Sequence, residues 1–479
     1  MSIRQNFFYS SILTTAGYIF PLITYPYVSR ILGVANIGVC NFVDSIVNYF
    51  VLFSMMGIRT IGIREIAKCN GDKAAMSETF SNLLFLNLFF VLIFSVIFFI
   101  VIQIVPQFAE HKVLMYVGIA KLFATFMLID WLYKGIEDFK YITIRSLIIR
   151  CIYVISIFIL VRSKDDYQIY FVLLVLTEGI NAMINCIHAR KFVNLKIKKL
   201  HPFKYINSSI TIGVYGFLTT MYTTFNVAYL GFVTNTIEVG YYTTATKLHH
   251  IVLALFTAFT GVMLPRMSKL IAEGKGLEFT RKINQSYSIL ISFSFPVIVL
   301  GICFSSEIIQ LISGAGYDGA ILPLMIVMPL VFVIGLEQVF VHQILMPQKK
   351  DKAILVNSVL GAVVGVGLNI LLVGRLGSVG SALVWFFSEL CVLCSATYFV
   401  KDYILLMPLK KKILSNLLLM LPAFFLCMSF RKLFESSLLA FVLSCALLLV
   451  YYGYIYVFIF NDENILSLLS IKINKNVKR

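Results

Sequence analysis

Long apolar runs separated by short polar or basic segments repeat along the whole chain. Each run has at least about 17 residues, the length that an α-helix needs to cross the hydrocarbon core of a bilayer. The apolar positions within a run are continuous rather than alternating, which is typical of membrane helices and not of membrane strands. The pattern predicts an all-α, multi-pass membrane protein with fourteen spans, at residues 7–28, 37–57, 81–106, 113–133, 141–161, 168–188, 208–233, 241–264, 286–312, 320–346, 354–373, 379–400, 413–430 and 437–460.

The composition supports the same interpretation. Of the 479 residues, 59% are hydrophobic and only 13% are charged, and the mean hydropathy is +0.90. A soluble domain is about 45–50% apolar and about 25% charged. Fourteen helices of about 20 residues would use about 280 positions. These values exclude a soluble enzyme with a single membrane anchor.

The net charge of +17 comes from 40 Lys and Arg residues against 23 Asp and Glu residues. Most of the basic residues lie in alternate segments between the spans, beginning with the N-terminal segment, and not in one patch that could bind nucleic acid. Basic loops remain on the cytoplasmic side of a membrane. The distribution therefore predicts a protein of the inner-membrane type with both termini in the cytoplasm.

Sequence motifs of soluble-enzyme chemistry are absent. The chain has no Walker A loop, no H-E-x-x-H, no G-x-S-x-G and no G-x-G-x-x-G motif. Its nine cysteines are scattered, and the C-x-x-C formed by Cys391 and Cys394 lies within an apolar run, where packing explains it. We therefore predict no enzyme activity, no metal and no cofactor. The loops are short, which argues against a polytopic glycan polymerase or transferase, since either needs a catalytic loop.

A faint internal repeat appears when the second half is aligned with the first at a shift of 202 residues. Ile37-Gly38 then matches Val239-Gly240, and the segment around Arg64 matches the segment around Arg266. Repeats of this kind are common in transporters. The repeat predicts two six-helix lobes followed by two extra helices, with boundaries at 1–206 for the N-lobe, 207–400 for the C-lobe and 401–479 for the extra helices and the tail.

Five segments form a recognisable series along the chain. They are Pro-Leu-Ile-Thr-Tyr-Pro-Tyr-Val-Ser-Arg-Ile-Leu-Gly-Val-Ala-Asn-Ile-Gly at 21–38, Leu-Phe-Ser-Met-Met-Gly-Ile-Arg-Thr-Ile-Gly-Ile-Arg-Glu-Ile-Ala at 52–67, Gly-Tyr-Asp-Gly-Ala at 316–320, Gln-Ile-Leu-Met-Pro-Gln-Lys-Lys at 343–350, and Asn369 with Arg-Leu-Gly-Ser-Val-Gly at 375–380. In this order they resemble the Wzx-type polysaccharide-repeat (O-antigen) flippases. That family shares a superfamily with the lipid II flippases and the multidrug and toxin extrusion antiporters. The resemblance implies a two-lobed bundle around a central, often cationic, cavity that alternates its access.

The resemblance also implies the cargo and the partners. We expect the chain to move undecaprenyl-pyrophosphate-linked oligosaccharide repeat units, of the O-antigen or capsule type, from the cytoplasmic to the periplasmic leaflet of the bacterial inner membrane. The expected partners are this lipid-linked oligosaccharide, the membrane lipids and the polysaccharide polymerase machinery.

Cations within or beside the spans are the candidates for binding a pyrophosphate. Charge inside a membrane helix is costly, so such residues face a bundle interior or a cavity and are functional candidates by default. Lys121 in the first lobe and Lys247 in the second could bind one pyrophosphate by charge-assisted hydrogen bonds. Arg30 and Arg59 lie at span ends, where the resemblance favours function. The alternatives are structural ion pairs for the lysines and extension of the side chain to the interface for the arginines.

Four acids lie deepest in the spans, namely Asp44, Glu178, Glu337 and Glu389. One of them could carry a coupling proton, because removal from water favours the neutral carboxyl group. The alternative is a neutral or salt-bridged packing role. Lys121 and Asp130 fall nine residues apart in one predicted helix, so they should point to opposite faces and should not pair.

Two other functions in the same superfamily remain open, a drug or cation antiporter and a lipid II flippase. Drug and cation antiporters of this superfamily often use an acid in the first span, and residues 7–28 contain none. The O-antigen-type flippase is therefore the favoured prediction.

Overall fold

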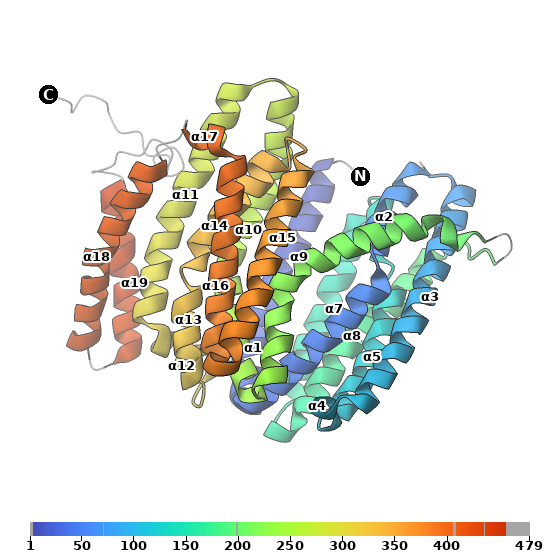
Figure 1. Ribbon diagram of the computed structural model, residues 1–479, viewed down its shortest axis with the longest axis horizontal. Coiled ribbons are helices and arrows are strands. Elements are labelled where there is room, and N and C mark those ends of the chain that lie inside the picture. Colours follow the sequence, from blue (N-terminus) through green and yellow to red (C-terminus); the bar gives the residue numbers. More distant parts are fainter. Residues whose placement is uncertain (1–2, 70, 198–199, 406–408, 435, 457–479) are drawn as a thin grey trace. The chain divides into compact units, whose positions relative to one another are not determined.

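The computed structural model describes residues 3–69, 71–197, 200–405, 409–434 and 436–456. Within these ranges the chain is almost entirely helical and has no β-strand. It divides into two compact units, residues 1–243 and 244–479, and the boundary lies within helix α10. The two units are coloured from blue to green and from green to red in Figure 1.

The first unit contains nine helices and the start of a tenth within the described residues. They are α1 (Ile3–Met55), α2 (Ile58–Lys68), α3 (Lys73–Ile104), α4 (Pro106–Ala109), α5 (Lys112–Met127), α6 (Asp130–Gly135), α7 (Phe139–Leu160), α8 (Tyr167–Ala189), α9 (Ile206–Val233) and α10 (Thr236–Ala272), with 3₁₀ turns η1 (Lys164–Asp166) and η2 (Pro202–Tyr205). In this unit α1 packs against α3, α5, α7 and α9, and α5 packs against α8.

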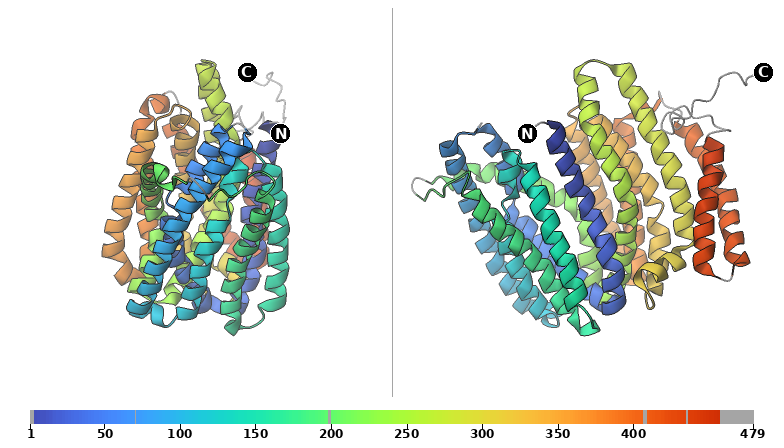
Figure 2. Two further views of the ribbon diagram at one scale, coloured as in Figure 1. Left: turned by 90° about the vertical axis from the view of Figure 1, so that its right-hand side faces the viewer. Right: turned by 180° about the vertical axis from the view of Figure 1, so that it is seen from behind.

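The second unit continues α10 and adds nine helices within its described part. They are α11 (Gly276–Cys303), α12 (Ser305–Ser313), α13 (Ile321–Val327), α14 (Leu330–Phe340), α15 (Asp351–Leu368), α16 (Gly374–Phe399), α17 (Lys401–Leu405), α18 (Leu409–Leu433) and α19 (Ser437–Tyr454), with the 3₁₀ turn η3 (Asp318–Ala320) and the π-helices η4 (Val341–Leu345) and η5 (Asn369–Val373). Figure 2 shows α18 and α19 as a hairpin, and α18 packs against α11.

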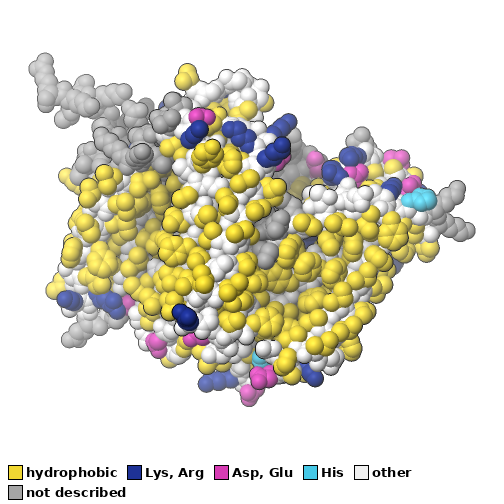
Figure 3. Space-filling model, in the orientation of Figure 1, with side chains coloured by type: hydrophobic (Ala, Val, Ile, Leu, Met, Phe, Trp, Pro, Cys, Tyr) yellow, Lys and Arg dark blue, Asp and Glu magenta, His cyan; other side chains and the backbone are white. Residues whose placement is uncertain are grey.

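Hydrophobic and charged side chains occupy different parts of the surface, as expected for a protein surrounded by lipid. Figure 3 shows hydrophobic side chains over the sides of the helices and charged side chains near their ends. Many large apolar residues are exposed along the helices, for example Phe99, Ile155, Val363, Leu418 and Leu449. A contiguous apolar exterior of this extent is stable in lipid and not in water.

The helices confirm the predicted all-α membrane architecture. Ten of them are long and apolar enough to cross a membrane, counted over the described residues. Two of these ten, Phe8–Lys68 and Asp351–Phe399, each include two of the predicted spans, while α9 and α19 fall outside the ten. Within the described residues the fourteen apolar runs lie mostly in helix, although the run 113–133 is interrupted after Met127 and the end of the run 437–460 lies outside the described residues. The number of complete spans stays a prediction.

Glycine breaks the helices where two predicted spans share one long element. Gly33 within α1 has φ 73° and Gly377 within α16 has φ 55°, both in the region that residues with a Cβ rarely adopt. These positions separate the span pairs 7–28 with 37–57 and 354–373 with 379–400.

Positions aligned by the internal repeat lie against each other in the first unit. A Cβ added to Gly38 would lie 3.0 Å from the amide nitrogen of Gly240 and 1.6 Å from the Thr236 carbonyl oxygen. One turn further along, the Asn41 amide donates to the Thr243 hydroxyl at 3.0 Å. Only glycine permits this close crossing of α1 and α10. The predicted division of the chain at residues 206 and 400 stays a prediction.

Candidate functional site

Lys121 holds together three helices of the first unit. Its Nζ lies 2.6 Å from Asp44 Oδ1 on α1 and 3.8 Å from Glu178 Oε1 on α8, and it also donates to Asn48 Oδ1 at 3.0 Å. The Asn48 amide donates to the second oxygen of Asp44 at 2.9 Å, and the Thr125 hydroxyl donates to Glu178 at 3.1 Å. Lys121 itself is buried. One lysine therefore has two carboxylate partners, and every member of the group has a charge-assisted hydrogen bond.

A second charged group lies where α5 ends. Arg145 on α7 is buried and donates through both terminal nitrogens to Asp130 Oδ1 at 3.2 Å. Asn185 on α8 accepts from Arg145 and donates both to Asp130 and to the Leu128 carbonyl oxygen. The hydroxyl of Tyr133 donates to the Asn185 carbonyl oxygen. Arg145 is thus bound to a carboxylate and an amide, which holds α6, α7 and α8 together.

Arg59 is placed by a sharp turn between α1 and α2. Gly57 caps α2 with φ 75°, and a Cβ there would lie 2.9 Å from the Ile212 side chain on α9. The preceding Met56 also has a positive φ, and its carbonyl oxygen accepts a hydrogen bond from Ser209. This turn directs Arg59, which is exposed, away from the packed face of α2. Only glycine fits both the backbone angle and the close approach of α9.

Two adjoining cavities lie within the first unit. The first has a volume of about 420 Å³ and is mostly polar, and the second has a volume of about 410 Å³ and is mostly apolar. Both include Asn48, Val51 and Arg59 in their linings. The polar cavity also contacts Lys121, Thr125, Leu128, Asp130, Arg145, Ser146, Arg150, Thr177, Glu178 and Asn181. The apolar cavity also contacts Tyr49, Leu52, Met55, Gly57, Thr60, Ile212, Gly213, Gly216 and Thr220.

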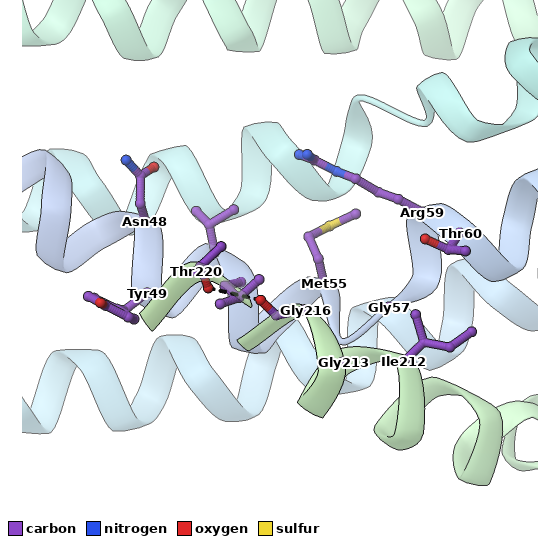
Figure 4. A pocket seen from close by; sticks show the side chains of 12 residues that line it. Asn48, Tyr49, Met55, Gly57, Arg59, Thr60, Ile212, Gly213, Gly216 and Thr220 are labelled. Atoms are coloured by element: carbon purple, nitrogen blue, oxygen red, sulfur yellow. Dashed lines mark hydrogen bonds between the residues drawn. The ribbon is translucent and has the colours of Figure 1, made fainter. Parts of the chain in front are cut away.

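Figure 4 shows how the side chains enter the apolar cavity. Asn48, Met55 and Arg59 extend toward the same side of α1 and α2, and the guanidinium of Arg59 points back toward the Asn48 side. Ile212 and Gly216 come from α9 on the other side of α1. Arg59 also contacts a third, smaller cavity beside Asp130. It is therefore the cation that the three cavities share.

Two of the four cations around the polar cavity have no carboxylate partner among the described residues. Lys121 and Arg145 are in ion pairs, whereas Arg59 and Arg150 are in no ion pair with any residue that the structure describes. Arg150 instead donates to the Leu13 carbonyl oxygen at 3.3 Å. Two unpaired guanidinium groups in a largely apolar protein favour an anion, and guanidinium binds phosphate with two parallel hydrogen bonds.

Some of the site residues predicted from the sequence lie at the polar cavity, and others do not. Lys121, Asp44, Glu178 and Arg59 lie at or beside the polar cavity, as described above. Arg30 lies on α1, is exposed, and does not contact any of the cavities described for this unit. Lys247 belongs to the second unit, on α10, where it is half-buried. That it acts with Lys121 on one group stays a prediction.

The relation predicted between Lys121 and Asp130 is partly wrong. The two do not pair, as expected, but both contact the same polar cavity. The helix that was predicted to be continuous over 113–133 ends at Met127 and restarts at Asp130, and Ile129 between them has φ 39°. The interruption turns Asp130 toward Arg145, so the rotation expected of one straight helix does not apply.

The remaining two predicted acids lie in the second unit, Glu337 on α14 and Glu389 on α16. Sequence reasoning also missed two residues of the polar cavity. They are Arg145 and Arg150, which both lie in the apolar run 141–161 but are not among the candidates named from the sequence. A lone arginine in an apolar run was the available signal for Arg150.

A multi-pass helical bundle with charged side chains around an intramembrane cavity is the architecture of a membrane transporter. Residues 3–271 match the family model described as "Polysaccharide biosynthesis protein", which is more than half of the chain. The chain belongs to this family, and the resemblance to polysaccharide-repeat flippases is confirmed.

Two curated relatives carry the description "Putative O-antigen transporter". The one from Escherichia coli (strain K12) is 26% identical over 361 residues, which are 74% of this chain and 85% of the relative. The one from Shigella dysenteriae is 25% identical over 408 residues, which are 81% and 98% of the two chains.

Solved structures show the same fold. A lipid II flippase, MurJ, in an inward closed conformation has a TM-score of 0.77 at 14% identity and covers 93% of this chain and 98% of its own. An outward-facing multidrug resistance transporter of the MATE family, in the MOP superfamily, has a TM-score of 0.55 at 14% identity and covers 86% and 97%. The predicted fold class of the MOP exporters is thereby confirmed.

Proposed function

We propose that this protein is a flippase that translocates undecaprenyl-pyrophosphate-linked oligosaccharide repeat units from the cytoplasmic to the periplasmic leaflet by alternating access. It acts as a transporter and not as an enzyme, in the bacterial inner membrane, with both termini in the cytoplasm. Family membership and the two O-antigen transporter relatives support this cargo.

The observation that carries the proposal is the pair of adjoining cavities that meet at Arg59. One is polar and has four cations in its lining, and the other is mainly apolar and includes Tyr49, Val51 and Leu52. A lipid-linked sugar needs both environments, because it has an anionic pyrophosphate, many hydroxyl groups and a hydrocarbon tail. In the proposed complex Arg59 and Arg150 bind the phosphates, and Lys247 is proposed as a further cation on sequence grounds alone.

Such a protein is needed because the sugar cannot cross the bilayer unaided. Moving one hydroxyl group from water into hydrocarbon costs about 4–8 kcal/mol. Every 1.36 kcal/mol slows a step about tenfold, so an oligosaccharide with many hydroxyls would not cross on a useful timescale. A polar path through the protein removes this barrier while the tail remains in lipid. No covalent chemistry is required.

The test is the leaflet distribution of the lipid-linked oligosaccharide in cells that lack the gene. We expect completed units to accumulate on the cytoplasmic face, with loss of surface polysaccharide, and a plasmid copy to restore export. An Arg59→Ala copy should fail to restore it, whereas Arg64→Ala should succeed, because Arg64 lies outside the described cavities and bonds Glu65 at 2.9 Å. Normal export with new drug sensitivity would favour an antiporter instead.

A lipid II flippase is the second candidate, favoured by the TM-score of 0.77 with one. The two functions differ in the consequence of losing the protein. Loss of a lipid II flippase stops cell-wall growth, whereas loss of a flippase for repeat units removes surface polysaccharide and leaves the wall intact. Viability of the deletion strain therefore separates them.

A further inference from the structure

A cavity of about 490 Å³ lies in the second unit, near the turn that joins α10 to α11. It is lined by Arg266 of α10 and by Leu277, Glu278, Arg281, Lys282 and Gln285 of α11. Figure 1 shows these two helices continuing past the ends of α14 and α16 to their turn, and Figure 3 shows Lys and Arg side chains at that end of the unit. The cavity is separate from those of the first unit.

The lining of this cavity has three cations and one carboxylate. Arg266 lies 3.8 Å from Glu278, and the two side chains are 54% and 45% exposed, so this ion pair is weak. Arg281 and Lys282 form no ion pair with any residue in the described part of the chain. Lys282 instead donates to the Gln285 amide oxygen at 2.7 Å. The excess of positive charge favours an anion, and guanidinium groups bind phosphate with paired hydrogen bonds.

Other basic residues of the same hairpin are neutralised within the chain. Lys269 and Lys275 both pair with Glu273, at 3.6 and 2.7 Å. Basic residues on this side of the predicted spans help to orient a membrane protein, and that role is sufficient for these two lysines. It does not explain why the cations of the cavity gather around one space, because like charges placed together repel. A bound anion would remove this repulsion.

The level of the cavity cations relative to the bilayer follows from the predicted spans. Arg266 lies two residues after the span 241–264, and Arg281 and Lys282 lie five and four residues before the span 286–312. At about 1.5 Å per helical residue, these positions are about 3–8 Å beyond the ends of the spans. The headgroup layer of one leaflet is about 5–8 Å thick. The three cations therefore lie at the level of the lipid phosphates.

The hairpin that carries the cations is held in place by its apolar side. Its buried side chains belong to the hydrophobic core of the second unit; they are Met267, Leu270, Phe279 and Ile283. The Phe279 ring also contacts the Tyr403 ring on α17, with centroids 5.7 Å apart. The cations are thus positioned before a ligand binds, which lowers the entropic cost of binding. Replacing them should leave this packing intact.

We propose that this cavity binds the phosphate group of an anionic phospholipid in the cytoplasmic leaflet. Arg266 donates to the phosphate from α10, and Arg281 and Lys282 donate to it from α11. The bound lipid therefore links the two helices at the end of the hairpin. The site is distinct from the proposed cargo site of the first unit, and binding involves no covalent step.

The experiment measures how well a bound lipid shields Lys282. The purified full-length chain is placed in phosphatidylcholine liposomes with or without phosphatidylglycerol, and no cargo is added. Lysines are acetylated with acetic anhydride, which is neutral and crosses the bilayer, and the rate at each lysine is measured by mass spectrometry of peptides. A ligand at about ten times its dissociation constant leaves about one-tenth of the sites free, so phosphatidylglycerol should slow acetylation of Lys282 about tenfold.

Lys269 is the matched control within the same molecule. It lies five residues after the span 241–264, at about the level of Arg281, but pairs with Glu273 and does not line the cavity. Its acetylation should change little, although any general attraction of the charged surface acts on it equally.

Two charge-matched double variants test which side chains form the site. Arg266→Gln with Arg281→Gln should remove the protection of Lys282. Lys275→Gln with Lys269→Gln removes the same charge from the same hairpin and should retain the protection. Melting temperatures of both double variants show whether the fold is kept.

The outcomes distinguish a lipid site from its alternatives. Equal slowing at Lys282 and Lys269, or protection that persists in Arg266→Gln with Arg281→Gln, would overturn the site in favour of general surface attraction. Inorganic phosphate that protects Lys282 in pure phosphatidylcholine as strongly as phosphatidylglycerol does would overturn the assignment to a lipid. Absence of any protection would overturn the proposal. None of these results depends on the proposed flippase function, because the sample contains no cargo.

Discussion

The two units differ in the partners of the acids that lie within their predicted spans. In the first unit Asp44 and Glu178 share one lysine, Lys121, at 2.6 and 3.8 Å. In the second unit Glu389 accepts a hydrogen bond from the Trp385 indole at 2.9 Å, and neither Glu337 nor Glu389 forms an ion pair with a residue that the structure describes. One cation thereby links α1, α5 and α8 in the first unit, whereas the hydrogen bond of Glu389 lies within α16. Asp44 and Glu178 therefore cross-link helices of the first unit, whereas Glu337 and Glu389 form no ion pair that would do so among the described residues.

The largest effect is expected when the lysine that balances the first unit is removed. Lys121→Met leaves two carboxylates without a cation, and breaking a fully buried pair costs about 3–5 kcal/mol. The carboxyl groups are about one-third exposed, with side-chain exposures of 35% and 36%, so we expect about 2–4 kcal/mol here. Thermal unfolding of the purified protein in detergent measures the loss. The triple variant Lys121→Met, Asp44→Asn, Glu178→Gln should regain most of it; a single variant as stable as the wild type would contradict the structural role.

The second-largest effect is expected for Arg59, a cation of the first unit that has no ion-pair partner among the described residues. Arg59→Ala should reduce lipid translocation about 10–100-fold, since a charge-assisted hydrogen bond contributes about 1.5–3 kcal/mol. Stability should change little, because Arg59 makes no ion pair with a described residue. Arg59→Lys should retain part of the activity, because an ammonium group binds phosphate without the bidentate geometry. Equal loss in Arg64→Ala would show that general loop charge, and not this site, is responsible.

Neutralising a buried acid of the second unit should affect stability less. The amide oxygen of a glutamine can still accept the hydrogen bond from the Trp385 indole, so Glu389→Gln should change the free energy of unfolding by no more than about 1 kcal/mol. Asp44→Asn, measured in the same way, should be more destabilising because it removes a partner of Lys121. If the two variants behave alike, the contrast between the units does not hold.

The smallest effect on stability is expected for a solvent-exposed ion pair at the turn between α10 and α11. Lys275 lies 2.7 Å from Glu273, and this hydrogen bond lowers the pKa of Glu273. A lowered carboxyl pKa contributes stability above the ordinary carboxyl pKa, and this contribution disappears as the pH falls through the lowered value. Exposed pairs contribute little, so Lys275→Ala should leave the melting temperature unchanged at neutral pH. A clear shift would mean that buried and exposed pairs do not differ as described.

Much of the fold was predictable from the sequence, because apolar runs of span length leave few alternatives in a membrane. The acids and lysines were also visible as charges within such runs. Their partners were not: Lys121 is 77 residues from Asp44, and nothing local specifies which helices meet. The break at Ile129 has no proline or glycine beside it, so the position of Asp130 and its bond to Arg145 required the structure.

Translocation by the purified chain in liposomes tests the central claim most directly. The sample contains the full chain, phospholipid and a fluorescent undecaprenyl-pyrophosphate oligosaccharide, and the readout is the fraction of label protected from an impermeant quencher. We predict that protection equilibrates far faster than in protein-free liposomes and that Arg59→Ala abolishes most of the difference. Liposomes with correctly folded wild-type protein that equilibrate no faster than empty ones would contradict the account.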